Sequence, residues 1–199
     1  MNYLAHIYLS GENELVTIGN FIADGIKGQS YKKYPVSIQM GILLHRHIDS
    51  FTDSHDIVRQ STKRLHEKYG HYSGIIVDIL YDHFLAKNWS TYCDVPLKTY
   101  VENFYSSLET HYDLLPLRIQ KMMPYMMTDN WLLSYATLDG ISRVLEGMNR
   151  RTKNRSGMDQ AILELKQFYE EFETEFSIFF DALIQYSKQT LNALNNRSI

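Results

Sequence analysis

The chain has 199 residues, of which 44% are hydrophobic and 22% are charged, and its formal net charge is −3. These values are typical of a globular protein with a sizeable core, and they argue against disorder and against a dedicated nucleic-acid binder. The single cysteine, Cys93, excludes an internal disulfide and a thiolate zinc cage. No apolar run approaches the ~20 residues of a membrane span, and residues 1–10 lack the pattern of a signal peptide. We therefore expect a cytoplasmic protein that acts on neither membranes nor nucleic acids.

In the first half of the chain, the apolar spacing predicts four helices separated by glycine and proline. Residues 13–26 place apolar side chains at steps of three and four, and Gly28 follows as a helix terminator. Pro35 is expected to open a second helix, because a first turn tolerates its missing N–H. Gly70 ends a third helix, and residues 75–87 predict a fourth.

The second half of the chain continues the helical pattern. Pro96, Pro116 and Pro124 predict helix starts or breaks. Residues 162–183 carry apolar side chains at steps of three and four, opposite a face rich in glutamate. No hairpin signal and no internal repeat occurs. The sequence thus predicts an all-α protein with one compact helical domain spanning residues 1–199.

Histidine and aspartate gather in two places along the predicted helices. His45 and Asp49 lie four residues apart, so they share one helix face, and Asp78 and Asp82 repeat that spacing on the next apolar helix, with His83 adjacent. A carboxylate on an apolar helix needs a partner, because an unpaired buried charge costs several kcal/mol.

Two kinds of partner are open for these aspartates. A divalent metal suits imidazole and carboxylate ligands contributed by several helices. Alternatively, each aspartate pairs with an arginine, and Arg46 and Arg59 stand nearby. Taken together, the two clusters favour the metal.

His6 and Asp24 also interrupt apolar stretches. A lone histidine on an apolar face is more often a hydrogen-bonded core residue than a ligand. Asp24 is followed by Gly25, which allows close approach of a backbone or a ligand. Both residues are therefore candidates for the same site.

Four motifs in this sequence resemble those of one bacterial enzyme family. They are residues 2–6 (NYLAH), 19–24 (GNFIAD), 45–49 (HRHID) and 78–85 (DILYDHFL). Together they are similar to the acyl carrier protein phosphodiesterases, also called acyl carrier protein hydrolases. The likeness continues through Trp131 and Gly147, so it covers most of the chain.

This resemblance implies an all-helical fold distantly related to the HD-domain metal phosphohydrolases. It implies a divalent cation, usually Mn²⁺, with Mg²⁺, Fe²⁺, Co²⁺ or Zn²⁺ as alternatives. The reaction it implies is hydrolysis of the phosphodiester between 4′-phosphopantetheine and a serine of holo-acyl carrier protein, which releases the apo-protein. Two other functions stay open. One is an HD-like phosphohydrolase acting on a nucleotide or another small phosphodiester, and the other is a non-catalytic helical binding module.

By the position of Asp24 in the motif, the resemblance implies that this residue is essential. The implied metal shell comprises Asp24, His45, Asp49, Asp78, Asp82 and His83, with His6 at its edge. HD proteins carry an adjacent His-Asp pair, whereas here the adjacent pair is reversed as Asp82-His83, which leaves open which members touch the metal. In the reaction, Asp24 or Asp49 would position or deprotonate water, and His6 or His83 would protonate the departing serine oxygen.

A basic segment is the candidate docking surface for the carrier protein. Acyl carrier proteins are acidic, so an enzyme that acts on them should present local positive charge. The favoured segment contains Arg143, Arg150, Arg151, Lys153 and Arg155. A second candidate is the helix that carries Arg59, Lys63, Arg64 and Lys68.

Overall fold

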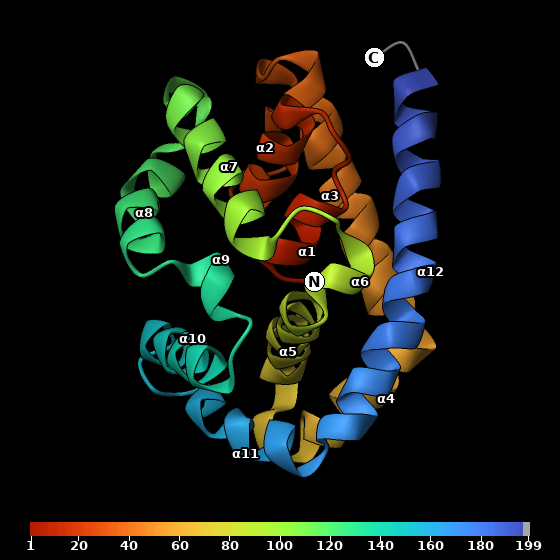
Figure 1. The fold of residues 1–199 in the computed structure, drawn as a ribbon, viewed down its shortest axis with the longest axis vertical. Helices are drawn as coiled ribbons and strands as arrows, with labels where there is room; N and C mark the ends of the chain where they lie inside the picture. The colour runs from red at the N-terminus through yellow and green to blue at the C-terminus, as the bar shows by residue number, and fades with distance from the viewer. Residues whose placement is uncertain (197–199) are drawn as a thin grey trace.

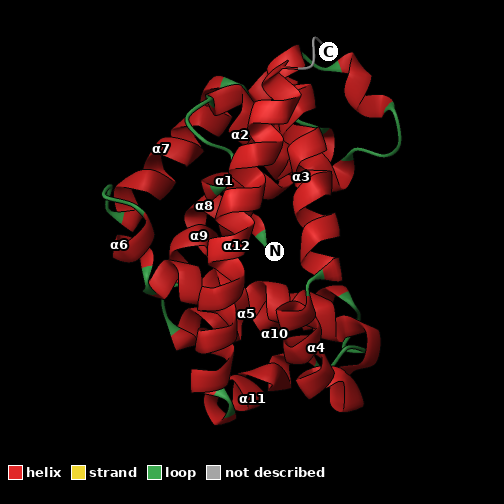
Figure 2. Cartoon of the chain, turned by 90° about the vertical axis from the view of Figure 1, so that its right-hand side faces the viewer, coloured by secondary structure: helices red, strands yellow, loops and turns green. Residues whose placement is uncertain are grey.

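The computed structural model describes residues 1–196, and every regular element in that range is helical. Figure 2 shows these helices joined by loops, without a strand in the described part of the chain. The all-α prediction is therefore confirmed, while the predicted domain end at Ile199 lies outside the described residues. The α-helices are α1 (Tyr3–Tyr8), α2 (Glu14–Ile22), α3 (Val36–Ser54), α4 (Asp56–Tyr69), α5 (Ser73–Lys87), α6 (Trp89–Tyr92), α7 (Leu97–Thr110), α8 (Leu117–Thr128), α9 (Trp131–Ser134), α10 (Leu138–Arg151), α11 (Ala161–Gln167) and α12 (Tyr169–Asn196). Short 3₁₀ helices lie at Ala23–Gly25, Ser30–Lys33, Gly70–Tyr72, Tyr112–Leu114 and Met158–Gln160.

Most of the predicted helix boundaries are found in the structure. Pro35, Pro96 and Pro116 each stand directly before a helix, namely α3, α7 and α8. Gly70 ends α4 with φ of 53°, a conformation that favours glycine. Two predictions differ from the structure. Pro124 lies inside α8 and marks neither a start nor a break, and α2 ends at Ile22 and gives way to the 3₁₀ helix Ala23–Gly25, so Gly28 does not terminate it.

The long apolar pattern near the C-terminus forms two helices. The chain leaves helical geometry at Phe168, between α11 and α12. Figure 1 shows α11 passing into α12 at one end of the molecule, from where α12 runs along one side. No proline or glycine marks this break, and the apolar spacing continues across it. Periodicity alone therefore predicts one helix.

The fifth helix is buried around most of its circumference. Ten residues of the run from Ile76 to Ala86 are buried, all except the half-buried Asp78. The helix packs against α1, α4, α10 and α12, and Figure 1 shows it inside the ring of the other elements. A helix that is apolar nearly all round belongs in a core, so Asp82 and His83 are carried into that core with it. No helix within residues 1–196 combines the length and the apolar character that crossing a bilayer requires.

Two glycines let the second and third helices touch backbone to backbone. A Cβ atom on Gly19 would lie 2.2 Å from the carbonyl oxygen of Ile38, and one on Gly41 would lie 2.0 Å from that of Val16. Neither position can hold a larger residue without moving a helix. The contact brings Asn20, next to Gly19, beside His45, one helical turn after Gly41.

Candidate metal centre and its cleft

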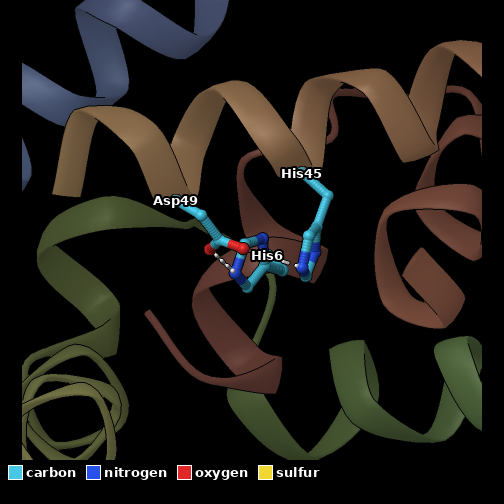
Figure 3. A group of neighbouring side chains, drawn as sticks. All are labelled: His6, His45 and Asp49. Carbon is cyan, nitrogen blue, oxygen red and sulfur yellow. Dashed lines mark ion pairs between the residues drawn. The ribbon is translucent and has the colours of Figure 1, made fainter. Parts of the chain in front are cut away.

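His6 of α1 meets His45 and Asp49 of α3 in one group of potential metal ligands. One ligand atom from each residue lies within 4.8 Å of the other two, and this is the one such group of three found among residues 1–196. The Nε2 atom of His45 is 3.1 Å from Asp49 Oδ2, and that of His6 is 3.3 Å from Asp49 Oδ1. Figure 3 shows both imidazole rings and the carboxylate converging on one small volume.

Asn20 orients both imidazole rings from the opposite side. Its Oδ1 atom lies 2.8 Å from His6 Nδ1 and 3.2 Å from His45 Nδ1. The rings stack with their centroids 4.0 Å apart, and Asn20 is fully buried beneath them. Sequence analysis did not single out Asn20 as a site residue, although it lies in the GNFIAD motif and interrupts an apolar helix as His6 does.

The charges within the group are strongly coupled. Burial and the neighbouring His45 lower the pKa of His6 to about 4, so this ring is neutral at pH 7. Burial opposes a charge on His45 as well, but the carboxylates of Asp24 and Asp49 raise its pKa to about 9. Burial likewise favours a neutral Asp49, yet the two imidazoles hold its pKa well below its usual range.

The donor set fits a divalent cation. The Nε2 atom of His6 is buried and forms no hydrogen bond, despite its closeness to Asp49. A neutral imidazole that donates from Nδ1 has a lone pair on Nε2, and a buried lone pair facing a carboxylate is unfavourable without a cation between them. Two imidazole nitrogens and a carboxylate are ligands that first-row divalent metals accept.

Asp24 stands at the open edge of this group. Its Oδ1 atom is 3.2 Å from His45 Nε2, and its side chain is 63% exposed. The imidazole of His45 holds the pKa of Asp24 below its ordinary value, so the carboxylate is ionised at neutral pH. Arg46 fixes the loop after Asp24 by donating to the carbonyl oxygens of Ile26 and Gly28, at 3.0 and 2.8 Å.

The group opens into a cleft of about 1150 Å³. The lining of the cleft carries both acidic and basic side chains. The acidic lining residues are Asp24, Asp49, Asp53, Asp78, Asp129 and Glu146, and the basic ones are Arg118, Arg143, Arg150 and Arg151. Aromatic side chains, including Tyr3 and Trp131, also line the cleft. The cleft therefore combines candidate metal ligands with positive charge for an anion.

Asp78 lines the cleft but stands outside the three-residue group. Its Oδ1 atom is 2.9 Å from the α-amino group of Met1, and the side chain is 32% exposed. Burial raises the pKa of Asp78 even though the ammonium group opposes this shift. Asp78 thus has a cationic partner within the chain.

Asp82 and His83 lie outside the three-residue group, although the resemblance implied both as part of the metal shell. The carboxylate of Asp82 accepts hydrogen bonds from the backbone N–H groups of Leu4 and Ala5, at 2.7 and 3.3 Å. Burial raises its pKa to about 7. His83 has its two ring nitrogens 2.7 Å from the carbonyl oxygen of Tyr135 and 2.8 Å from the hydroxyl of Tyr169. Neither residue lines the cleft.

The two arginines weighed as alternative partners bind elsewhere. Arg46 contacts backbone carbonyl groups, and Arg59 lies 3.5 Å from the exposed Asp56. Neither side chain is paired with Asp49, Asp78 or Asp82. Arginine pairing therefore does not explain the buried aspartates.

The predicted basic segment divides into two parts. Arg143, Arg150 and Arg151 line the cleft, whereas Lys153 and Arg155 do not. Arg118 of α8 joins the first three. Sequence analysis missed it because it lies 25 positions before Arg143, and only Lys121 adds a second basic residue to its helix. In the second candidate patch, Arg64 is bound by Glu175 at 2.6 Å and Lys68 by Glu164 at 2.7 Å. In the first, Arg150 makes a longer, exposed contact with Glu146 at 3.9 Å.

Comparison with known proteins assigns the chain to a family. Residues 1–183 match the family model described as acyl carrier protein phosphodiesterase. The chain belongs to this family. A protein of Pectobacterium atrosepticum with the name acyl carrier protein phosphodiesterase is 32% identical over 189 residues, which cover 94% of this chain and 98% of the relative. The proteins with the same name in Photorhabdus laumondii and Escherichia coli K12 are 31% and 30% identical, over 93% and 96% of this chain and 94% and 100% of the relatives.

No solved structure matches the chain, so the predicted likeness to HD-domain folds stays a prediction.

Proposed function

We propose that this protein is a cytoplasmic, metal-dependent phosphodiesterase that removes 4′-phosphopantetheine from the serine of holo-acyl carrier protein. The observation that carries the proposal is the group of His6, His45 and Asp49, which opens with Asp24 onto an arginine-lined cleft. Membership in the acyl carrier protein phosphodiesterase family supplies the substrate. The two imidazoles and the carboxylate can hold a cation, which is why we place the attack on the phosphodiester at this group.

Three side chains are proposed to hold the cation, and Asp24 stands beside them. They are His6 and His45 through Nε2, and Asp49 through its carboxylate, and we expect Mn²⁺ as the resident ion. A cation bound there supplies positive charge against the phosphodiester and increases the acidity of a water molecule. Asp78 lines the same cleft and remains a candidate, but Asp82 and His83 do not, because their hydrogen bonds hold them in the core.

The residues of the chain then have separable tasks. Asp24 is ionised and exposed to the cleft, and its Oδ1 lies 3.2 Å from His45 Nε2, the atom proposed to bind the cation. This position suits Asp24 to orient or deprotonate an attacking water beside that cation. Arg118, Arg143 and Arg151 can neutralise the phosphate and receive acidic side chains of the carrier protein. His83 is assigned no part in proton transfer, because both of its nitrogens are bound outside the cleft.

Intact-protein mass spectrometry tests the reaction directly. Purified protein is incubated with holo-acyl carrier protein and Mn²⁺, and a mass loss equal to phosphopantetheine is expected. EDTA and Asp24→Ala should each abolish the loss. Full activity of Asp24→Ala would overturn the assigned role of this residue. Cleavage of small phosphodiesters without cleavage of the carrier protein would point instead to a phosphohydrolase of small molecules.

Charge reversal tests the docking surface. The pair Arg150→Glu and Arg151→Glu should raise KM for the carrier protein by roughly 10-fold or more, because like charges then face each other. The increase should shrink at high salt. The pair Lys153→Glu and Arg155→Glu changes the net charge equally outside the cleft lining, so it is the matched control. Equal effects of both pairs would show that overall charge, rather than the cleft arginines, attracts the substrate.

A further inference from the structure

We propose that Asn20 is the positioning residue of the metal centre: its single carboxamide oxygen fixes both imidazole rings so that Nε2 of each faces the cation. This inference rests on the proposed metal centre and adds a residue to it. Asn20 touches neither the cation nor the substrate in this scheme. It acts through the two histidines.

The hydrogen bonds around Asn20 leave one orientation of its amide. The Nδ2 group donates to the carbonyl oxygen of His6 and to the hydroxyl of Ser10, each at 2.9 Å. Ser10 in turn donates to the same carbonyl oxygen at 2.7 Å. With both donors of the amide engaged, Oδ1 is the atom turned toward the rings, and it can only accept.

One acceptor between two rings determines where their protons lie. Because Oδ1 is 2.8 Å from His6 Nδ1 and 3.2 Å from His45 Nδ1, each ring must donate from Nδ1. The proton of a neutral ring then occupies Nδ1 and its lone pair occupies Nε2. For His6, that lone pair belongs to the buried Nε2 atom without a hydrogen bond. Partners that hold the second nitrogen of a metal-binding histidine fix its tautomer and ring orientation.

The fold secures this arrangement through the glycine contact between α2 and α3. Gly19 and Gly41 bring the two backbones together, so the short side chain of Asn20 reaches the ring of His45 across the helix interface. The same side chain reaches His6 and Ser10, in the last turn and just beyond the end of α1. Asn20 thus links α1 and α3 from its place on α2: Oδ1 accepts from both rings, and Nδ2 donates to the backbone of His6 and to Ser10.

Three variants separate this role from a purely structural one. Asn20→Leu keeps the branched shape and the number of side-chain heavy atoms but removes the acceptor, and it should lower the affinity for Mn²⁺ by roughly 10- to 100-fold. Asn20→Asp retains an acceptor for both rings, and it should keep the affinity within a few-fold of wild type even though the protein is less stable. Ser10→Ala removes one hydrogen bond of the amide but leaves Oδ1 in place, so it should lower stability without changing affinity.

The experiment measures Mn²⁺ binding to metal-stripped, folded protein by calorimetry, without carrier protein. Nitrogen NMR of the histidines should show Nδ1-protonated His6 in the wild type, and loss of this tautomer preference in Asn20→Leu. Unchanged affinity and tautomer in Asn20→Leu would overturn the inference, as would a wild-type protein that binds no divalent cation. If wild type binds Mn²⁺ with the expected Asn20 dependence but leaves holo-acyl carrier protein intact, the proposed substrate fails while this inference stands.

Discussion

The molecule contains two groups of histidine and aspartate side chains. They differ in how many of their polar atoms form hydrogen bonds within the protein. In the Asp82–His83 pair, two backbone N–H groups donate hydrogen bonds to the carboxylate of Asp82. The ring nitrogens of His83 form hydrogen bonds with a carbonyl oxygen and a hydroxyl. In the group of His6, His45 and Asp49, Asn20 binds one nitrogen of each ring, and the other nitrogens point toward a carboxylate at the cleft.

This difference separates a structural from a functional polar cluster. Buried polar atoms are nearly always hydrogen-bonded, so a buried nitrogen with no hydrogen bond calls for a ligand. The buried Nε2 atom of His6 is such an atom, and neither nitrogen of His83 is. The presence of histidine and aspartate on an apolar helix does not distinguish the two cases, but their remaining hydrogen-bonding capacity does.

The largest expected effect is a loss of activity when a histidine of the proposed metal centre is removed. His45→Ala should reduce kcat/KM by roughly 1000-fold, because a cation contributes several kcal/mol to phosphodiester cleavage. It should also remove Mn²⁺ binding while the helical circular dichroism persists. His83→Gln is the counterpart in the other group, and it should keep Mn²⁺ binding but unfold at a lower denaturant concentration.

Metal content and urea unfolding of the two variants decide this prediction together. If His83→Gln lost Mn²⁺ as completely as His45→Ala did, the two groups would belong to one metal site, and the distinction between them would fail.

Asp82→Ala should have the next largest effect, and it concerns stability. The substitution leaves the N–H groups of Leu4 and Ala5 without their buried acceptor, and each such group costs about 1–3 kcal/mol. These N–H groups start the helix that carries His6, so the first helix should loosen together with the ring. Urea unfolding of the metal-free protein measures the loss.

Asp82→Asn is the control, because its amide oxygen still accepts from at least one of the two groups. A stability of Asp82→Ala equal to that of wild type would show that the carboxylate does not secure the first helix.

The sequence allowed much of the fold to be predicted, because prolines and glycines mark helix ends through local backbone chemistry. Pro35, Pro96, Pro116 and Gly70 all lie at the predicted boundaries. The break at Phe168 was not predictable in this way, since it depends on packing between distant segments. Local spacing also placed His45 and Asp49 on one helix face, which the structure shows to converge on one volume.

The rest of the site depends on contacts between helices, which spacing does not encode. Asp82 and His83 have the same residue types and apolar surroundings as a ligand pair, yet the backbone of α1 and the hydroxyl of Tyr169 bind them. Asn20 and Arg118 enter the site from α2 and α8. Asn20 interrupts an apolar helix as His6 does, but that pattern does not show which side chains it binds. The arrangement of the helices therefore decides which polar residues are used.

The pH dependence of stability should have opposite signs for the two groups. Asp49 has a lowered pKa in the folded protein because both imidazoles favour its charge, despite burial. Its contribution is therefore present above the unfolded-state pKa of about 4 and is lost as the pH falls below it. Asp82 has a pKa raised by burial to about 7. Folding therefore favours its protonated form, and the contribution is full below pH ~4 and is lost as the pH rises to about 7.

Urea unfolding of metal-free protein between pH 3 and pH 8, values chosen to span both ranges (about 4 and about 7), should resolve the two slopes. Asp82→Asn should gain stability relative to wild type as the pH rises from about 4 to about 7, by at most about 4 kcal/mol for a shift of this size. Asp49→Asn should instead flatten the loss of stability on the acidic side. If both variants changed the same side of the profile, the two carboxylates would share one environment. Opposite sides would mean that burial controls Asp82 and that the imidazoles control Asp49, the physical difference expected between a core carboxylate and a metal ligand.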